Sequence, residues 1–421
     1  MTAGFQPVFL LSEENGLKGT SGKLERSLPP EQGWSRPPPK RQLLNLIKAL
    51  PPDRKARKGQ KSFMKKYKVG IIGCTGMVGQ RFALLLENHP WFDVKLLAAS
   101  PRSAGKTYEE AVGGRWSMES PMPAAMKSMV VRDASQVEAI AGEVDFVFCA
   151  VDMPKAEIKA LEEAYAKAEC PVISNNSANR GTPDVPMIIP ELNPEHAGVI
   201  PFQRARLGTK RGFIAVKSNC SLQSYVPALF PLSRWGVKRA LVCTYQAISG
   251  AGKTFASWPE MVDNMIPYIG GEEEKSEQEP LKIWGKLENG VIVPASTPSF
   301  TAQCLRVPVT NGHFAAVFCD FENKPSKEEI IDAWTSFRGR AQELDLPSAP
   351  KQFLHYFTED NMPQTRLHRG LEGGMAVSLG RLREDTQYDY KFVGLSHNTL
   401  RGAAGGAVLM AELLCAEGYM D

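Results

Sequence analysis

The chain has 421 residues, of which 43% are hydrophobic and 23% are charged, and its formal net charge is +4. This is ordinary globular composition with enough length for two domains, and the apolar runs are strand-sized, far short of the roughly 20 residues that cross a bilayer, so we expect no membrane segment. Residues 1–63 carry twelve Lys or Arg against five Asp or Glu, so the rest of the chain sits near −3 and has no electrostatic reason to bind nucleic acid or an anionic membrane.

Residues 1–63 form a basic, proline-rich extension. They hold eight of the 31 prolines and the basic stretch 54–58, and little periodic apolar pattern beyond 43–50. This composition predicts disorder. No hydrophobic core precedes a small-residue cleavage site, and several glutamates argue against a transit peptide, although organellar targeting stays open. Since Met64 leads straight into a predicted strand, residues 1–63 could be an upstream extension with no part in the fold.

From Lys68 onward, short strands rich in Val and Ile alternate with segments of helical length. Strands are predicted at 68–72, 93–99, 145–151 and 171–174, and helices at 76–88 and 156–167. This alternation indicates a parallel sheet covered by helices, an α/β Rossmann-type doubly wound domain that we place at residues 64–216.

After about Val216 the strand candidates become longer, at 240–249, 306–309 and 315–321, with helical stretches and loops between them. This pattern predicts a second, mixed α+β domain at residues 217–397. An apolar helix rich in Ala and Gly at 400–414 could return to the first domain, so we treat 398–421 as a separate C-terminal segment. We find no internal repeat.

The first predicted strand runs into a glycine loop. Gly73, Gly76 and Gly79 recur at a three-residue spacing before the first helix, with Thr75, Met77 and Val78 between them. Glycine permits the tight turn and lets backbone N–H groups approach a phosphate at a helix N-terminus, so the loop predicts a dinucleotide site. The alternative is that these glycines serve a tight turn and bind no ligand.

The end of the second strand suggests which dinucleotide binds. A binder of NAD usually presents Asp or Glu there for the ribose hydroxyls. This chain instead has Ser100, Arg102, Ser103 and Lys106. Hydroxyls and cations suit a 2′-phosphate, so we expect NADP(H), unless the two cations are merely solvated loop charges.

Eight cysteines are spread singly, without the spacing of a zinc site or the density of a disulfide scaffold, so we expect no metal and a reducing, cytoplasmic environment. Cys220, in Lys217-Ser218-Asn219-Cys220-Ser221, follows a possible strand and precedes a probable helix. A thiolate at a helix N-terminus can have a lowered pKa, which would make Cys220 a nucleophile. A lone cysteine is otherwise more often an inert buried residue.

His313 follows the strand candidate at 306–309 and a turn containing Asn311 and Gly312. Histidine titrates near neutrality and can pass a proton to and from a thiol or its adducts. Taken alone, His313 could equally be a structural residue. The five other histidines lie in less suggestive surroundings.

Three motifs in this order together resemble aspartate-semialdehyde dehydrogenase, particularly its archaeal and fungal branch. They are the glycine loop of Gly73 to Gly79, Ser218-Asn219-Cys220, and Arg306 seven residues before His313. The resemblance runs from about Lys65 to the end of the chain. It implies an NADP-binding Rossmann domain completed by the C-terminal helix, and a catalytic domain that also builds the interface of a homodimer or homotetramer.

The resemblance also implies roles for individual residues. Cys220 would be the nucleophile held near Asn219, Gln246 would orient the bound acyl group, and His313 would be the acid–base. Arg306 would grip the substrate carboxylate, for which the planar guanidinium is better suited than a lysine.

Further roles follow from the same likeness. Arg180 and Lys275 would bind phosphate, and Glu272 would meet the substrate amino group, although the acidic run 272–274 could equally be a solvated helix face. The nicotinamide would lie beside three residues, Ser249, Gly250 and Asn398. This chain departs from many relatives where Ser221, Leu222 and Gln223 follow the cysteine in place of two threonines.

The function implied is NADPH-dependent reduction of L-4-aspartyl phosphate to L-aspartate 4-semialdehyde through a thioester on the cysteine, a step in the biosynthesis of lysine, threonine and methionine. One alternative is a malonyl-CoA reductase on the same framework, which needs no acyl-phosphate grip. A glyceraldehyde-phosphate dehydrogenase fits less well because its nucleophile motif resembles Ser-Cys-Thr-Thr-Asn. A catalytically silent dinucleotide sensor is a third reading, which the presence of Cys220, Arg306 and His313 disfavours.

Overall fold

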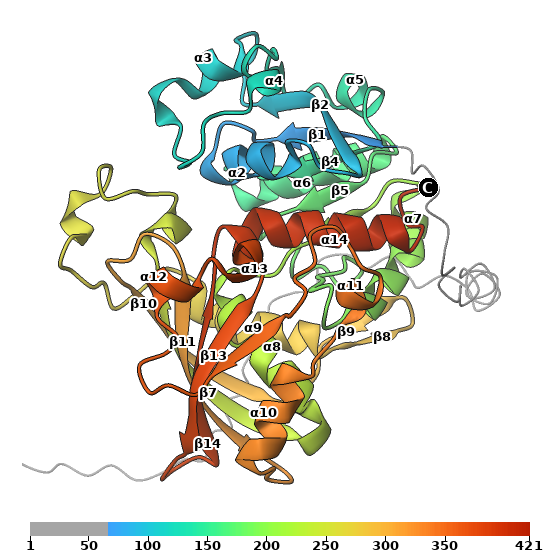
Figure 1. Ribbon diagram of the computed structural model, residues 1–421. Coiled ribbons are helices and arrows are strands. Elements are labelled where there is room, and N and C mark those ends of the chain that lie inside the picture. The colour runs from blue at the N-terminus through green and yellow to red at the C-terminus, as the bar shows by residue number, and fades with distance from the viewer. Residues whose placement is uncertain (1–65) are drawn as a thin grey trace, which may run out of the picture. The chain divides into compact units, whose positions relative to one another are not determined.

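A computed structural model describes residues 66–421. The predicted disordered extension at 1–63 and the hypothesis of a start at Met64 lie outside the described residues. Two six-stranded sheets organise the described part of the chain (Figure 1). None of the helices in residues 66–421 is long and apolar enough to cross a membrane.

The first sheet is wholly parallel, with strand order β3-β2-β1-β4-β5-β6. Its strands are β1 (Tyr67–Ile72), β2 (Phe92–Ala99), β3 (Arg132–Asp133), β4 (Phe146–Cys149), β5 (Val172–Ser174) and β6 (Ile214–Val216). The helical segments around them are α2 (Met77–Leu86), α3 (Tyr108–Val112), η1 (Gly113–Arg115), α4 (Ala124–Lys127), α5 (Val137–Ala141), α6 (Lys155–Lys167), η2 (Pro194–Val199) and α7 (Ile200–Leu207). The predicted doubly wound sheet is therefore confirmed.

Burial explains why these short segments form strands. Every residue of β4, β5 and β6 is buried, as are the last four residues of β1 and of β2. Strands covered on both faces need continuous apolar runs, which is the pattern of a parallel sheet between helices. The carboxyl ends of β1, β4, β5 and β6 meet along one edge, and that edge carries the glycine loop and leads to Cys220.

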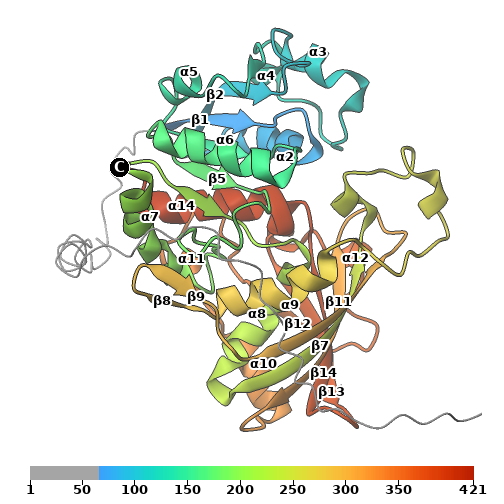
Figure 2. The same ribbon diagram turned by 180° about the vertical axis from the view of Figure 1, so that it is seen from behind.

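The second sheet is mixed, with strand order β10-β7-β11-β14-β13-β12. Its strands are β7 (Val237–Gln246), β10 (Ser299–Arg306), β11 (His313–Phe321), β12 (Leu354–Phe357), β13 (Val377–Glu384) and β14 (Tyr390–Ser396). A separate hairpin is formed by β8 (Lys286–Glu288) and β9 (Val291–Val293). Figure 2 shows α9 (Glu272–Ile283) and α10 (Lys327–Thr335) on one side of the larger sheet.

Short helical segments connect the strands of this second region. They are η3 (Ser221–Ser224), α8 (Val226–Leu229), η4 (Phe230–Trp235), η5 (Ile248–Ala251), η6 (Pro259–Met261), α11 (Arg340–Glu343), α12 (Thr365–His368) and α13 (Leu371–Gly374). The mixed α+β character expected from the sequence is confirmed. The domain limits at 216 and 397 stay predictions.

Two strand predictions in this region were wrong in position. The strand expected at 306–309 is β10, which ends at Arg306. Val307 N–H still donates to Gln246 O at 3.0 Å, but Pro308 has no N–H with which to continue the ladder. Because β10 consists largely of half-exposed and polar residues, it does not stand out as an apolar run in the sequence. The strand expected at 240–249 begins at Val237 and stops at Gln246, where the chain enters η5. Strands β12 to β14 were missed.

The C-terminal segment packs on the first sheet. A π turn, η7 (Leu400–Ala404), leads into α14 (Gly405–Ala416), whose first eleven residues are buried together with residues of β1, β2 and β4. Inside the turn, Arg401 makes a bidentate pair with Glu191 at 2.7 and 2.5 Å and donates from Nε to Gln223 at 3.0 Å. Helix α14 therefore packs against the parallel sheet, and the limits of the C-terminal segment at 398–421 stay a prediction.

Candidate active site

Cys220 lies in the turn between β6 and η3. The predicted helix after Cys220 is wrong, because the chain forms only the four-residue 3-10 segment η3 and then the four-residue α8. Such short segments have little dipole, so the helix N-terminus argument for an activated thiol is lost. Gly402 of the π turn packs against the cysteine, since a Cβ placed on Gly402 would lie 2.9 Å from Cys220 Cβ.

The thiol of Cys220 and the ring of His313 face each other although they are far apart in sequence. Sγ lies 3.4 Å from Nε2 of His313, which is fully buried at the start of β11. The Ala247 N–H donates to Nδ1 of the same ring at 3.1 Å. Because Nδ1 accepts this bond, the proton of the neutral imidazole is on Nε2 and points toward sulfur.

The surroundings set the protonation of both groups. Burial raises the pKa of the Cys220 thiol and Glu272 adds to this, which outweighs the opposite effect of Lys217, Arg180 and Arg306. Burial, followed by the charge of Arg306, lowers the pKa of His313 well below its usual value. The expected low pKa of the thiol is therefore wrong for the free site, which holds a neutral thiol next to a neutral imidazole.

Glu272, at the start of α9, organises the residue before the cysteine. Both of its oxygens accept from Asn219 Nδ2 at 3.0 Å, and one accepts from Gln246 Nε2 at 3.3 Å. Lys275 Nζ lies 2.6 Å from the same carboxylate. Burial raises the pKa of Glu272, but Lys275, Asn219 and Gln246 together outweigh it and the net pKa is lowered. Glu272 is a buried, ionised part of the site and not a solvated helix face.

Arg306, the last residue of β10, is buried next to the cysteine–histidine pair. Its Nη1 donates to Ala247 O at 2.7 Å, and its backbone pairs with that of Ile266. A Cβ on Gly250 would lie 2.9 Å from Nη1 of Arg306 and 3.0 Å from the ring of His313. Gly250 thus packs against both groups, and Arg306 retains N–H groups that could bind a carboxylate.

Arg180 approaches the same turn from the first sheet. Its Nε donates to Lys217 O at 2.9 Å, Nη2 donates to Asn175 O at 3.1 Å, and Nη1 pairs with Glu279 at 3.0 Å. Separate parts of the chain therefore bring the predicted catalytic and substrate-binding residues to one place. They are Cys220, His313, Asn219, Gln246, Arg180, Glu272, Lys275 and Arg306.

The three glycines of the loop between β1 and α2 have different structural roles. Gly73 has φ +87°, and a Cβ there would lie 2.4 Å from Ala150 O, while a Cβ on Gly79 would lie 2.2 Å from Gly73 O. These two glycines permit close backbone packing. Gly76 is exposed at the start of α2, where no side chain caps the helix, and a Cβ there would meet nothing closer than 3.6 Å. The residues fit a phosphate at the open helix end, with Thr75, Met77 and Val78 partly exposed around it.

The turn after β2 also fits the predicted cofactor. Ser100 and Arg102 are exposed, and Ser103 is buried with its N–H donating to Ser100 O at 2.9 Å. Because β2 lies beside β1, this turn is next to the glycine loop.

At the carboxyl end of β5, Asn175 Nδ2 is buried with no partner among residues 66–421, as expected for a group that meets a ligand.

The three residues predicted beside the nicotinamide come together near His313. Asn398 Nδ2 donates to Ser249 Oγ at 2.8 Å, and Asn398 Oδ1 accepts from the N–H of Gly312 at 2.8 Å. Gly250 contacts His313 as described above. Ser249, Gly250 and Asn398 therefore lie together beside the imidazole of His313.

Sequence reasoning missed several polar residues of the site. Lys217 is 2% exposed, donates to Ser218 O at 2.6 Å, and has its pKa lowered to about 7 by burial and the nearby Arg180. Glu279 pairs with Arg180, and Gln223 links Ser218 to Arg401. The spacing of Glu272 and Glu279, two helical turns apart, was the one sequence signal for Glu279. No group of His, Cys, Asp and Glu in residues 66–421 could hold a metal.

A parallel dinucleotide-type sheet joined to a mixed sheet, with a cysteine beside a buried histidine, defines the class of two-domain dehydrogenases that work on acyl groups. Comparison with known proteins agrees. Residues 68–199 match the family model of the NAD binding domain of semialdehyde dehydrogenases, and residues 229–401 match the model of their dimerisation domain. The chain belongs to the aspartate-semialdehyde dehydrogenase family.

Curated relatives cover most of the chain. The aspartate-semialdehyde dehydrogenase of Methanothermobacter thermautotrophicus is 42% identical over 349 residues, which are 82% of this chain and 98% of that protein. The enzyme of Aspergillus fumigatus is 40% identical over 85% of this chain and 99% of its own length. The solved Candida albicans enzyme with NADP aligns at a TM-score of 0.77 and 38% identity, covering 84% of this chain and all of that one.

Proposed function

We propose that this chain catalyses the NADPH-dependent reductive dephosphorylation of L-4-aspartyl phosphate to L-aspartate 4-semialdehyde, in the biosynthesis of lysine, threonine and methionine. The observation that carries the proposal is the 3.4 Å approach of Cys220 Sγ to His313 Nε2 in a site that also holds Arg180 and Arg306. The relatives that match nearly their whole length bear the corresponding name.

The substrate would be held at its two ends by opposite groups. Arg306 would pair with the α-carboxylate through its planar fork, and Glu272 would meet the amino group. Arg180 and Lys275 would bind the phosphate. Since Glu272 also holds Asn219 and Gln246, the same carboxylate orients the residue next to the nucleophile and the amide that would face the acyl oxygen.

Cys220 loses its proton to solvent, the thiolate attacks the acyl carbonyl, and phosphate leaves to give a thioester on sulfur. Only the thiolate attacks, and its high intrinsic nucleophilicity compensates for a small ionised fraction. The Nε2–H of His313 donates to sulfur in the free site, which stabilises the thiolate once it forms. Arg180 and Lys275 offset the charge of the departing phosphate.

The dinucleotide, when bound, supplies the hydride that reduces the thioester. The glycine loop would hold its phosphates, and Ser100, Arg102 and Ser103 would hold the 2′-phosphate. Ser249, Gly250 and Asn398 would keep the nicotinamide near the imidazole. The Nε2–H of His313 would donate a hydrogen bond to the oxyanion of the reduced adduct, and the collapse of that oxyanion would break the C–S bond, release the aldehyde and return Cys220 as a thiolate.

A malonyl-CoA reductase is the less favoured reading. A malonyl-CoA reductase releases no phosphate from an acyl phosphate, so it would not need Arg180 and Lys275 to bind phosphate. The curated relatives are aspartate-semialdehyde dehydrogenases. A silent dinucleotide sensor would need neither Cys220 nor His313. Malonyl-CoA supplied as the substrate with NADPH gives a direct comparison of the first alternative.

Phosphate-dependent reduction of NADP by aspartate semialdehyde tests substrate, cofactor and reaction together. We expect turnover in the unmodified chain and none in Cys220→Ala, because Cys220 is the thiol that contacts His313 among residues 66–421. Binding of NADPH, followed by fluorescence titration, should stay within about twofold, since Cys220 does not belong to the dinucleotide loop. Full activity of the variant would refute the nucleophile assignment, and activity with malonyl-CoA alone would favour the alternative.

The enzyme is a homo-oligomer of the kind its dimerisation domain implies. We propose a homodimer formed through the open face of the second sheet, and a tetramer would be a pair of such dimers. On that face, half-buried apolar residues pair across β7 and β11, namely Leu241 with Phe318, Cys243 with Ala316 and Tyr245 with Phe314.

All eight cysteines are free thiols, which supports a cytoplasmic location.

A further inference from the structure

We propose that Glu279 is a positioning residue that couples phosphate binding to the nucleophile, by holding the Arg180 guanidinium and the turn before Cys220 with one carboxylate. The proposal rests on the proposed function, since it concerns the phosphate leaving group of that reaction. Glu279 would act through Arg180 and Asn219 and would not itself touch the substrate.

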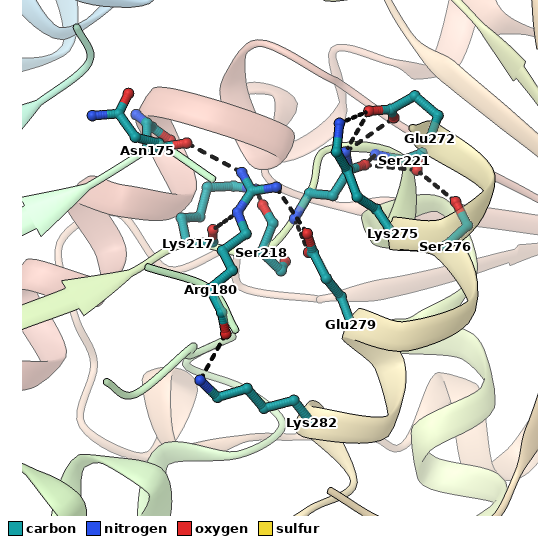
Figure 3. A network of polar contacts seen from close by, with 12 residues as sticks. Asn175, Arg180, Lys217, Ser218, Ser221, Glu272, Lys275, Ser276, Glu279 and Lys282 are labelled. Atoms are coloured by element: carbon teal, nitrogen blue, oxygen red, sulfur yellow. Dashed lines mark hydrogen bonds and ion pairs between the residues drawn. The ribbon is translucent and has the colours of Figure 1, made fainter. Parts of the chain in front are cut away.

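Glu279 lies on the inner face of α9. It follows Glu272 by seven residues, or two helical turns, and Ser276 lies between them, so the three side chains point to the same side. Figure 3 shows this row of side chains turned toward Arg180 and the nucleophile turn. The side chains of Glu279 and Arg180 are 10% and 11% exposed. Their ion pair is therefore largely removed from solvent.

The two oxygens of Glu279 have different partners. Oε1 lies 3.0 Å from Arg180 Nη1, and Oε2 accepts from the backbone N–H of Asn219 at 2.6 Å. Asn219 is the residue before the nucleophile. A shift of the guanidinium would therefore be transmitted through one rigid carboxylate to the backbone beside Cys220.

Arg180 has few donors left for a ligand. A guanidinium has five N–H groups, and here three are occupied, one each by Lys217 O, Asn175 O and Glu279. One N–H on each terminal nitrogen stays available, which suits two oxygens of a phosphate. Glu279 thus fixes which edge of the fork faces the substrate.

The helix α9 also holds the neighbours of this pair. Glu272 accepts from the side chain of Asn219, so the two acids hold the same residue by its side chain and its backbone. One turn beyond Glu279, Lys282 Nζ donates to the carbonyl of Arg180 at 2.7 Å. The backbone of Arg180, its guanidinium and the turn before Cys220 are all tied to one helix, and Glu279 is the only member among the described residues that joins Arg180 to Asn219.

The variant that separates the two tasks is Glu279→Gln. An amide has one acceptor oxygen, so it can serve either Arg180 or the Asn219 N–H, and its NH₂ group then faces the other donor. Glu279→Asp keeps both oxygens and the charge at shorter reach. Glu274→Gln on the exposed side of the same helix is the matched control, because it makes the same charge change without contacting the site.

The measurement is protection of Cys220 by inorganic phosphate in the full-length protein. Iodoacetamide labelling of Cys220 is followed by mass spectrometry at increasing phosphate, and NADPH affinity and thermal melting are recorded for each variant. We expect Glu279→Gln to need about tenfold more phosphate for half-protection, Glu279→Asp an intermediate amount, and Glu274→Gln the same amount as the unmodified chain within about twofold. NADPH affinity should stay unchanged throughout.

Arg180→Ala completes a double-mutant cycle. If Glu279 acts through Arg180, adding Glu279→Gln to Arg180→Ala should change half-protection by less than about twofold. An equally large effect in that background, an unchanged value in Glu279→Gln, or no protection of the unmodified chain would each overturn the inference. If Glu279→Gln does not melt cooperatively, Glu279→Asp carries the test. Turnover with aspartate semialdehyde is scored separately, so its absence contradicts the proposed function alone.

Discussion

At the scale of single residues, the site pairs a thiol and an imidazole that are both neutral when no ligand is bound. Burial disfavours the thiolate of Cys220 and the imidazolium of His313, and the bond from Ala247 N–H to Nδ1 further opposes a second proton on the ring. An ion pair of thiolate and imidazolium is therefore not the resting state. In the proposed reaction the imidazole would act as a hydrogen-bond donor through Nε2, first to sulfur and then to an oxyanion.

The pH dependence of Cys220 labelling follows from these directions. A raised pKa keeps the thiol protonated to higher pH, so iodoacetamide labelling of the free enzyme should rise through a single step centred above the ordinary value of about 8.5. Because His313 stays neutral down to well below its usual value, no second step should occur near pH 6.5. Mass spectrometry of the Cys220 peptide from about pH 6 to about pH 10 provides the measurement. A step below about pH 7 would mean that thiolate and imidazolium form a pair after all.

At the scale of elements, the three equally spaced glycines in the turn from β1 to α2 have different structural roles. Gly73 and Gly79 allow the helix to start close against the strand, because any Cβ there would meet backbone atoms. Gly76 leaves the helix N-terminus open to a phosphate. Gly73 and Gly79 therefore serve the fold, and we expect Gly76 to serve the ligand.

Two alanine substitutions should separate these tasks. At Gly76, φ is −75° and the nearest atom to a new Cβ is 3.6 Å away, so the fold should be unaffected while the methyl group lowers NADPH affinity by about tenfold. At Gly79, a Cβ 2.2 Å from Gly73 O forces the backbone to move and should cost roughly 1–3 kcal/mol of stability. Fluorescence titration and thermal melting give the two readouts. A Gly76→Ala protein that binds NADPH normally would remove the loop from the phosphate site.

At the scale of the whole molecule, the described residues form one site from both sheets. The first sheet supplies Arg180 and the dinucleotide loop, and the second supplies His313 and Arg306. The buried pair of Arg401 with Glu191 joins the C-terminal turn to the first region, and Gln223 carries the link to the nucleophile turn. Parts of the chain remote from one another thus hold the cysteine in place.

The open face of the second sheet should decide the oligomeric state. Phe318→Asp places a charge among the half-buried apolar residues of β7 and β11, and a buried unpaired charge is costly. We therefore expect this variant to sediment as a monomer in analytical ultracentrifugation. Leu367→Asp is the control, because Leu367 on α12 is 59% exposed and is not one of the paired residues of β7 and β11. Unchanged sedimentation of Phe318→Asp would place the interface elsewhere.

The sequence by itself determined the alternation of strands and helices that makes the first sheet, and the chemistry that the site could have. Apolar runs of strand length alternating with helical segments predicted the parallel sheet, because strands covered on both faces must be continuously apolar. The glycine spacing and the run from Lys217 to Ser221 likewise marked the loop and the cysteine. Strand β10 was missed because its residues alternate and are half-exposed, and β13 and β14 because Arg, Lys, Ser and Gly interrupt their apolar residues.

Only the tertiary structure decided which residues meet and how each is protonated. Cys220 and His313 are 93 positions apart, and their contact depends on the pairing of β7, β10 and β11. The raised pKa of the thiol comes from burial and from Glu272, and Glu279 gains its place from the face of α9 that packs inward. Burial and neighbouring charges are properties of the folded chain, so the sequence could mark Cys220 as a candidate nucleophile without giving its ionisation state.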